Sequence, residues 1–198
     1  MTVNINCITN CCPSVENCPP DDFSDDFGTD DPAWGDGVDP TTYSVTGGQL
    51  VIEEGLRKIC REWPANGTIA VQVTAVTTPG NLLVSENPAG ATTPVRTAEL
   101  VGSLDFGGFY QFQWHTGSTL ASDTISVVPD DGDVLKIEMD IVSDVIVEYR
   151  AYINGNLELT QNTGVAKSTD TGEGDAFGGW YGMGEGTYDD FSYVVTEP

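Results

Sequence analysis

Carboxylates crowd one short segment near the start of the chain, residues 21–39, which holds eight aspartates. Carboxylate oxygens at close spacing are ligands that a hard cation such as Ca²⁺ prefers. The spacing is not that of an EF-hand loop, which needs glycine at its sixth position and glutamate at its twelfth. Phe23, Phe27 and Trp34 interleave with the aspartates. The segment is therefore predicted to be either a cation-binding loop or a solvated loop that its aromatic rings anchor.

Four of the five cysteines lie near the start of the chain, at Cys7, Cys11, Cys12 and Cys18. Three interpretations stay open: disulfides within this segment, a zinc site, and free or intermolecular thiols. Adjacent cysteines do not easily pair with each other. The spacing fits a zinc site only loosely, and no histidine is near. We predict that residues 1–20 form an extended N-terminal arm whose four cysteines anchor or cross-link the protein.

Two more residues have types that could carry chemistry. His115 is the only histidine, so a Ser-His-Asp triad would have to use it, yet nothing around it resembles a nucleophile elbow. A structural role at the end of a strand is the favoured interpretation. Cys60 is either a buried free thiol or the cysteine that makes the count even within an assembly.

The charge balance is strongly acidic, with 31 acidic against 7 basic residues and a formal net charge of −24. Such a surface repels nucleic acid and anionic membranes. No apolar run reaches 18 residues, and the first residues lack the basic and apolar regions of a secretory signal peptide. We therefore expect neither nucleic acid nor a membrane among the partners. The plainest role of the acidity is solvation.

The element that must position these groups is centred on residues 135–160, where apolar and polar residues alternate. Successive strand side chains face opposite sides of a sheet, so Ile137 and Glu138 point opposite ways. The pair Asn154-Gly155 separates two such runs and favours a type I′ hairpin turn. The region is predicted to be the middle of an antiparallel meander.

Shorter patterns predict the remaining elements. Residues 56–63 form either one helical turn or an edge strand, whose basic side chains either dock on an acidic neighbour or balance charge locally. Residues 77–94 are predicted to be a long loop, and residues 172–188 a glycine-rich stretch. Alternation predicts strands over residues 43–52 (two, about a glycine turn), 68–76, 82–84, 109–115, 124–128 and 191–195.

Length and composition favour one all-β domain with a two-sheet core over residues 21–198, preceded by the arm. Four pieces, in this order, resemble the concanavalin A-like lectin/glucanase superfamily, including its laminin-G-like members. They are the acidic-aromatic segment with Trp34 and the strand around Tyr43, the meander of residues 135–155, the glycine-rich approach, and Asp189-Asp190-Phe191. The resemblance implies a jelly-roll β-sandwich of two antiparallel sheets, which agrees with the alternation.

The resemblance also implies a cofactor, since members of this superfamily often carry structural Ca²⁺ near the chain ends. The residues implied here are Asp25 or Asp26 near the start and Asp189 or Asp190 near the end. The alternative for the second pair is that it caps a turn.

Some glycosidases of this superfamily place the motif E-x-D-x-x-E on one strand, with the two glutamates as nucleophile and acid/base. Retaining chemistry needs two carboxyl groups about 5 Å apart. This chain has Glu138 and Asp140, but Ser143 stands at the acid/base position. Asp144 would face the wrong side of a regular strand. The broken motif predicts that the protein is not an enzyme.

Two non-enzymatic functions follow. The first is a bacteriophage virion component, a capsid decoration protein or a tail or fibre subunit, whose partners are other virion subunits or further copies of itself. Its motivation is a lectin-like module with a cysteine-bearing arm, high acidity and no export signal. The second is a glycan-binding module of a cell-surface or secreted protein. Such modules stack sugars on aromatic rings, and the candidates are Trp180, Tyr181 and Trp114.

Overall fold

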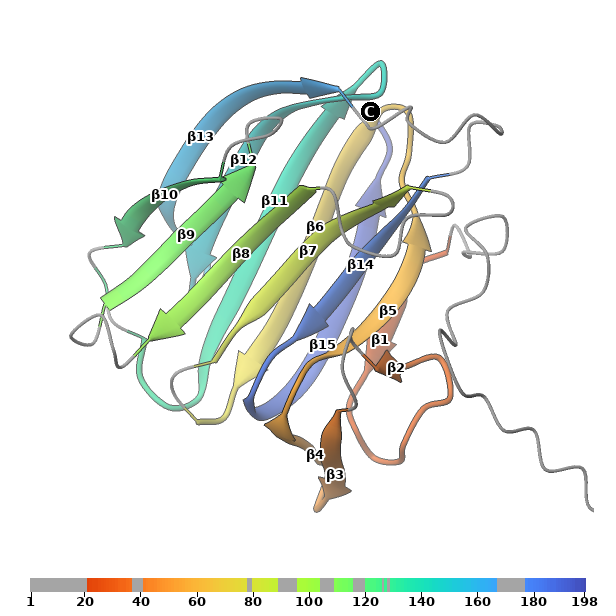
Figure 1. Cartoon of the computed structure of the whole chain (residues 1–198), viewed down its shortest axis with the longest axis vertical. Coiled ribbons are helices and arrows are strands. Elements are labelled where there is room, and N and C mark those ends of the chain that lie inside the picture. Colours follow the sequence, from red (N-terminus) through yellow and green to blue (C-terminus); the bar gives the residue numbers. More distant parts are fainter. Residues whose placement is uncertain are drawn as a thin grey trace, which may run out of the picture.

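The computed structural model describes residues 21–36, 41–77, 80–88, 96–103, 109–115, 120–125, 127, 129–166 and 177–198. Within these residues the chain forms fifteen strands and no helix. The strands make two antiparallel sheets that lie face to face (Figure 1). No helix in the described ranges is long and apolar enough to cross a bilayer. The predicted all-β sandwich is confirmed, whereas the predicted arm with its cysteines lies outside the described residues.

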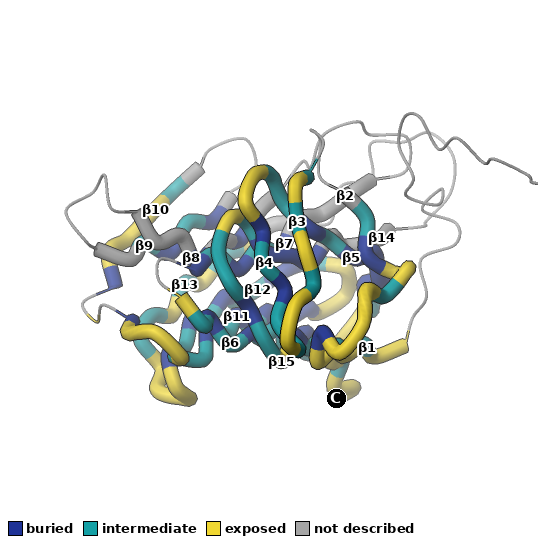
Figure 2. Tube along the Cα trace, turned by 90° about the horizontal axis from the view of Figure 1, so that it is seen from below, coloured by how far each residue is buried: buried dark blue, intermediate teal, exposed yellow. Residues whose placement is uncertain are grey.

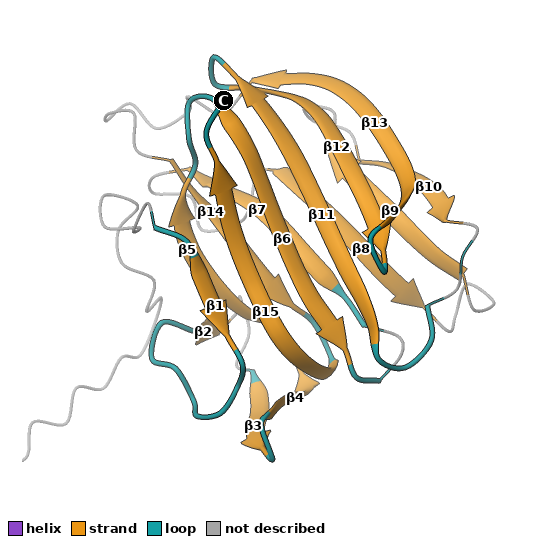
Figure 3. Cartoon of the chain, turned by 180° about the vertical axis from the view of Figure 1, so that it is seen from behind, coloured by secondary structure: helices purple, strands orange, loops and turns teal. Residues whose placement is uncertain are grey.

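The first sheet, sheet A, faces the viewer in Figure 3. Its strands follow the order β13-β12-β11-β6-β15-β4-β3, and β1 also pairs with β15. The bounds are β1 (Phe23–Asp25), β3 (Thr42–Thr46), β4 (Gln49–Glu54), β6 (Gly67–Ala75), β11 (Asp133–Val142), β12 (Val145–Ile153), β13 (Asn156–Ala166) and β15 (Gly186–Thr196).

The second sheet, sheet B, has the order β10-β9-β8-β7-β14-β5-β2. The bounds are β2 (Gly35–Asp36), β5 (Arg57–Glu62), β7 (Leu82–Pro88), β8 (Arg96–Ser103), β9 (Phe109–His115), β10 (Leu120–Ile125) and β14 (Phe177–Met183). Neither β8 nor a strand at β14 is predicted from the sequence. The last strand before the meander, predicted at 124–128, lies earlier, at β10.

The predicted meander is β11-β12-β13, and both of its turns use positive backbone angles. Asn154 and Gly155 have φ of 51° and 76°, as a type I′ turn requires. Ser143 and Asp144 take φ of 50° and 62° without any glycine. Their amides are held by Asn66 Oδ1 at 2.8 Å and the carbonyl of Ala65 at 2.9 Å. These contacts offset the strain of a left-handed turn built from residues other than glycine.

The core fills the space between the two sheets, where Figure 2 shows the buried residues. Alternate residues of β6 and β11 point inward and are fully buried, including Val71 and Ile137. Aromatic rings join the sheets. Tyr181 of β14 meets Tyr193 of β15 with ring centroids 4.4 Å apart, and Phe112 of β9 meets Tyr149 of β12 at 6.3 Å. Such pairs add directional contacts to apolar burial.

The segment at 56–63 is a strand, β5, and it lies between β14 and β2. Its two arginines are buried, Arg57 at 3 % and Arg61 at 7 % exposure. Arg57 pairs with Asp30 at 3.1 Å and lies 3.6 Å from the centroid of the Tyr43 ring. The buried arginines do not present a basic docking patch. Charge balancing within the chain, the alternative interpretation, is what the Arg57–Asp30 pair shows.

Candidate functional site

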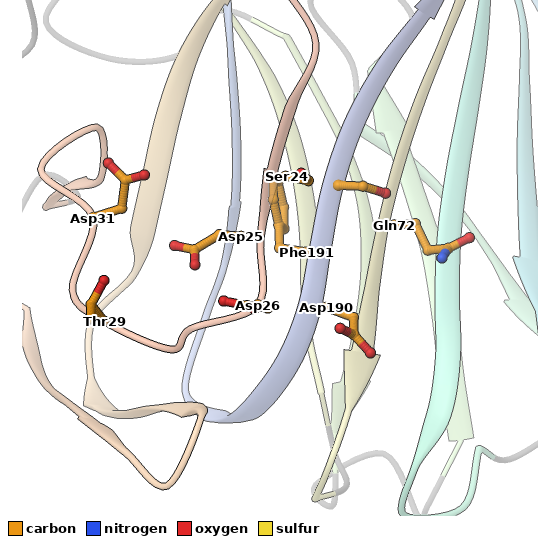
Figure 4. Close-up of a pocket in the computed structure, with 9 residues that line it drawn as sticks. Ser24, Asp25, Asp26, Thr29, Asp31, Gln72, Asp190 and Phe191 are labelled. Carbon is orange, nitrogen blue, oxygen red and sulfur yellow. The ribbon is translucent and has the colours of Figure 1, made fainter.

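The outer face of sheet A carries a pocket of about 630 Å³ where β1 and the loop after it meet β15 and β6. Figure 4 shows Asp25, Asp26 and Asp31 on one side of it and Asp190 and Gln72 on the other. Its walls are mostly polar. The lining residues are Ser24, Asp25, Asp26, Thr29, Asp31, Gln72, Asp190, Phe191 and Ser192.

Strand pairing brings β1 and β15, which are far apart in the sequence, together at this pocket. Antiparallel pairing of β1 with β15 places Asp25 opposite Phe191 and Ser24 opposite Ser192. The register of β15 with β6 shifts between Asp189 and Ser192, which is a β-bulge. Asp190 occupies the bulge with φ of 49° and is exposed at the pocket. The bulge therefore turns a side chain of a continuous strand toward the loop after β1.

The floor of the pocket rests on a cluster of aromatic rings. Trp34 lies edge-on to Phe191 at 4.8 Å and to Phe23 at 5.6 Å, and Phe27 packs 6.0 Å from Trp34. Asp25 ties the loop to this cluster, since its carboxylate accepts hydrogen bonds from Phe27 N at 2.7 Å and Trp34 Nε1 at 2.6 Å. The sequence-based alternative of a loop anchored by its aromatics is thus confirmed for residues 21–36.

The same loop is clamped from its far side. Asp30 accepts a hydrogen bond from the Tyr43 hydroxyl at 2.8 Å and an ion-paired one from Arg57 Nη2 at 3.1 Å. Burial and the hydrogen bond to Asp30 raise the pKa of Tyr43 above its ordinary value. Asp30 therefore fixes the loop to β3 and β5 without lining the pocket itself.

The four aspartates predicted to bind Ca²⁺ do not all lie at the pocket. Asp25, Asp26 and Asp190 line the pocket, but Asp189 does not. Asp25 uses both oxygens on Phe27 and Trp34, and Asp26 Oδ1 accepts from Gly28 N at 3.0 Å. In the described ranges no three acidic, histidine or cysteine side chains are grouped as a metal ion needs. The fold therefore brings three of the four to one pocket, and Ca²⁺ binding by these aspartates stays a prediction.

Beside the pocket, the outer face of β11 and β12 carries an ion network centred on Arg150. Arg150 donates to Asp140 at 2.7 and 2.8 Å, to Glu138 at 3.0 Å and also to Glu148. Lys136 Nζ donates to Glu138 at 2.6 Å and the Tyr152 hydroxyl does so at 2.7 Å. Glu138, Asp140 and Glu148 therefore each accept at least one hydrogen bond from Arg150.

The network holds the two acidic residues of the sequence motif ionised. The hydrogen bond from Arg150 lowers the pKa of Asp140. Burial raises the pKa of Glu138, but the hydrogen bonds from Lys136, Tyr152 and Arg150 outweigh burial, and the net change is downward. Ser143, the third motif position, lies in the turn after β11. This trio does not offer the protonated carboxyl that a glycosidase needs as its acid.

Two of the three predicted sugar-stacking rings, Tyr181 and Trp114, do not present free faces. Tyr181 is fully buried against Tyr193, and Trp114 is 7 % exposed and stacked on Phe112 at 5.7 Å. Both are core residues, because their strands point them between the sheets, and their assignment as stacking residues is corrected. Trp180 pairs through its backbone with Cys60 and Ser85 in β14, and its side chain lies outside the described residues, as does that of His115.

Cys60 is buried and disulfide-bonded, which excludes the free-thiol alternative for this residue. The other cysteines, Cys7, Cys11, Cys12 and Cys18, lie outside the described residues. Their predicted anchoring role stays a prediction.

Sequence reasoning missed several pocket residues, notably Gln72, Ser192 and Thr29. Alternation in the predicted strand 68–76 does place Gln72 on the polar face. That Gln72 lies beside Ser192 could not be predicted, because it depends on the pairing of β6 with β15, which joins residues more than a hundred positions apart.

Solved structures of carbohydrate-acting proteins share this architecture. The β-glucanase of Bacillus licheniformis superposes with a TM-score of 0.61 at 11 % identity, over 87 % of this chain and 97 % of that one. A β-1,3-1,4-glucanase (lichenase) from a mouse hindgut metagenome gives 0.59 at 11 % identity, over 88 % and 99 %. This protein has the concanavalin A-like fold.

The carbohydrate recognition domain of Emp47p shares the same concanavalin A-like fold, with a TM-score of 0.52 at 10 % identity over 88 % of this chain and 94 % of that one. No family model matches the chain, and no curated protein matches its sequence. At such identities the likeness shows the fold alone.

The sequence-based prediction that the protein is not an enzyme is wrong. It excluded catalysis from one broken motif on one strand, whereas the solved structures with this concanavalin A-like fold include β-glucanases. A motif that fails at Ser143 is too narrow a ground for such an exclusion.

Proposed function

We propose that this protein binds carbohydrate, and that the pocket between β1, β15 and β6 takes a sugar unit. The observation that carries the proposal is the pocket itself. Its volume of about 630 Å³ lies within the range of small-molecule sites, and its floor is packed on the ring of Trp34. Its lining groups come from three strands and one loop, so they converge on one space.

The chemistry of the lining suits hydroxyl groups. Four carboxylates, those of Asp25, Asp26, Asp31 and Asp190, accept hydrogen bonds, while Gln72 and the hydroxyls of Ser24, Thr29 and Ser192 both donate and accept. The hydroxyl groups of a sugar both donate and accept hydrogen bonds around a compact ring. Among the described residues that line the pocket there is no lysine or arginine, so the field of these residues opposes anionic sugars and admits neutral ones.

The comparisons support this proposal at the level of ligand class. Solved structures that superpose with TM-scores of 0.5 or more include proteins named as glucanases, a glycosidic hydrolase, a laminarinase and carbohydrate recognition domains. The disulfide at Cys60 adds support for a place in an oxidising compartment, such as the extracellular space or a cell surface.

The virion role stays a prediction. It was motivated by the arm of residues 1–20, which lies outside the described residues, and no contact in the described part of the chain supports it over sugar binding. That the partners are virion subunits or further copies of this chain also stays a prediction.

The test is a glycan array probed with the full chain, followed by calorimetric titration with mixed-linkage β-glucan oligosaccharides and laminarin oligosaccharides. Release of reducing ends is measured on the same samples, because the fold is shared by glucanases. Binding of at least one neutral glycan is expected.

The variant that ties binding to the pocket is Asp190→Asn, which tolerates the positive φ and removes an acceptor charge. It should weaken binding about tenfold or more. Glu54→Gln, an exposed change on β4 outside the pocket, is the matched control and should bind as the parent does. Equal affinity of Asp190→Asn and the parent would place the sugar elsewhere, and an array without hits would end the proposal.

A further inference from the structure

A single row of side chains crosses the outer face of sheet A, beginning in the pocket. Each member of the row lies directly opposite the next in the strand register, on β1, β15, β6, β11, β12 and β13 in turn. The members are Ser24, Ser192, Gln72, Lys136, Tyr152 and Leu157. Figure 3 shows these six strands side by side.

The row stays on the outer face throughout. Ser24 is exposed, Leu157 is 54 % exposed, and the four between them are partly exposed, while their chain neighbours Phe23, Phe191 and Tyr193 pack inward. Strands lie about 4.8 Å apart, so the five steps from Ser24 to Leu157 span about 24 Å. The first three members line the pocket, so the row continues the pocket across the sheet.

The chemistry of the row changes along its length. Hydroxyl and amide groups on β1, β15 and β6 give way to a cation, Lys136, and then to a ring and an aliphatic side chain, Tyr152 and Leu157. Polar groups beside a ring and an exposed leucine suit an amphipathic ligand. A sugar ring is of this kind, with hydroxyls at its rim and C–H groups on its faces.

The middle of the row is held in place before any ligand arrives. Lys136 Nζ lies 4.5 Å from the centroid of the Tyr152 ring, and both side chains donate to Glu138, at 2.6 and 2.7 Å. Arg150 holds Glu138 in turn at 3.0 Å. Side chains already fixed lose little conformational entropy on binding. The ion network beside the pocket thus positions Lys136 and Tyr152.

The neighbouring row on one side lacks this character. The next row toward the end of β15 runs through Val194, Ala70, Glu138, Arg150 and Thr160, and its charges are satisfied by one another. Continuity with the pocket singles out the first row.

We propose that this row extends the carbohydrate site, so that the ligand is a neutral oligosaccharide lying across the strands from the pocket to Leu157. The inference rests on the proposed function and names its substrate class: a chain of several sugar units rather than a single sugar. The acidic pocket at one end selects against uronic acids. Lys136 gives them no compensating site, because Glu138 already neutralises it.

The experiment compares ligand length in the full chain by calorimetry, using glucose, the disaccharide, the tetrasaccharide and the hexasaccharide of mixed-linkage β-glucan. Affinity should rise at each lengthening up to the span of the row. Gln72→Ala and Leu157→Ser should each weaken hexasaccharide binding about three- to tenfold. Leu157→Ser should leave the shortest bound ligand unaffected, since Leu157 lies at the far end.

Thr160→Ala is the matched control, an exposed β13 change on the same face but one row away, and it should bind the hexasaccharide as the parent does. Melting curves confirm that each variant folds. If short sugars bind and longer ones bind no better, the extension is wrong while the pocket stands. If no oligosaccharide binds at all, both fail. An equal loss of hexasaccharide affinity in Thr160→Ala and Leu157→Ser would also show that the ligand does not follow this row.

Discussion

Arg150 donates from both terminal guanidinium nitrogens to Asp140, Nη1 to Oδ2 at 2.7 Å and Nη2 to Oδ1 at 2.8 Å. This two-point ion pair joins neighbouring strands β11 and β12 on the outer face of sheet A. The same guanidinium serves Glu138 and Glu148. One cation thereby holds three carboxylates that would otherwise repel one another, and it does so beside the proposed sugar row.

Replacing this cation should be costly. We expect Arg150→Met to lower the free energy of unfolding by about 2 kcal/mol, because three partly buried carboxylates lose charged hydrogen bonds and repel. Urea unfolding followed by circular dichroism measures the change. Thr160→Ala, at the position directly opposite Arg150 on β13, should change stability by less than about 0.5 kcal/mol. A loss in Arg150→Met no larger than that would show that the network adds nothing.

The network also predicts how stability responds to acid. The folded-state pKa values of Glu138 and Asp140 lie below their ordinary values of 4.5 and 3.8. The folded protein therefore binds fewer protons than the unfolded chain in this range. Their contribution is present in full above pH 4.5 and is lost as the pH falls through the lowered values.

Urea titrations at several pH values check this sign. The free energy of unfolding should fall as the medium is acidified below pH 4.5, and the fall should be shallower in Arg150→Met, whose carboxylates have lost their main donor. Parallel acid profiles for the two proteins would mean that other carboxylates control the acid response.

Gly182 in β14 is predicted to tolerate no side chain. A Cβ there would collide with the backbone carbonyl of Arg57 on β5, which cannot move away as a flexible side chain could. We expect Gly182→Ala to cost at least about 3 kcal/mol or to prevent folding.

Gly164→Ala in β13 is the matched control. A Cβ there meets nothing within 4 Å, and its φ is not in the left-handed region. We expect no loss, or a gain of a few tenths of a kcal/mol, because alanine restricts the unfolded chain more than glycine does. Thermal melts of the two variants should differ widely. A Gly182→Ala variant that melts with the parent would show that β14 and β5 are not packed this closely.

Removing divalent cations should leave the melting temperature unchanged within about 1 °C, since Asp25 is committed to Phe27 and Trp34 and the described carboxylates are not grouped around an ion. The measurement is a melt after dialysis against excess EDTA, repeated with added CaCl₂. A fall of several degrees that CaCl₂ reverses in the parent but not in Asp190→Asn would instead assign a Ca²⁺ site to the pocket.

The clamp on the loop after β1 gives a last expectation. Asp30→Asn keeps an acceptor for Tyr43 but loses the charge that pairs with Arg57, and about 1 kcal/mol of stability should go with it. Asp30 does not line the pocket, so any loss of sugar affinity must act through the loop. Asp21→Asn, an exposed change outside the pocket, is the comparison. Differential scanning calorimetry with and without sugar separates the two effects.

Local patterns in the sequence determined the strands that are regular and the turns that are short. Alternation of apolar and polar residues predicted β6, β9 and the meander of β11 to β13, because a side chain's face depends only on its place along a strand. The pair Asn154-Gly155 predicted its hairpin turn, because few residues accept the positive φ that a type I′ turn requires. The sequence also predicted, as one of two alternatives, that aromatic rings anchor the acidic loop, since Phe23, Phe27 and Trp34 stand among the aspartates.

Only the tertiary structure decided what lies beside what. Strand β14 is so rich in glycine that apolar and polar residues do not alternate along it, yet it is a central strand of sheet B. Position 182 leaves no room for a side chain because the backbone of β5 approaches Gly182 closely. Tyr181 and Trp114 could have faced either side of their sheets, and the stacking of the two layers buried them. The pocket and the row from Ser24 to Leu157 depend on register between strands far apart in the chain. The sequence of a strand shows which of its residues share one face, but the register between strands is set by the packing of the whole core.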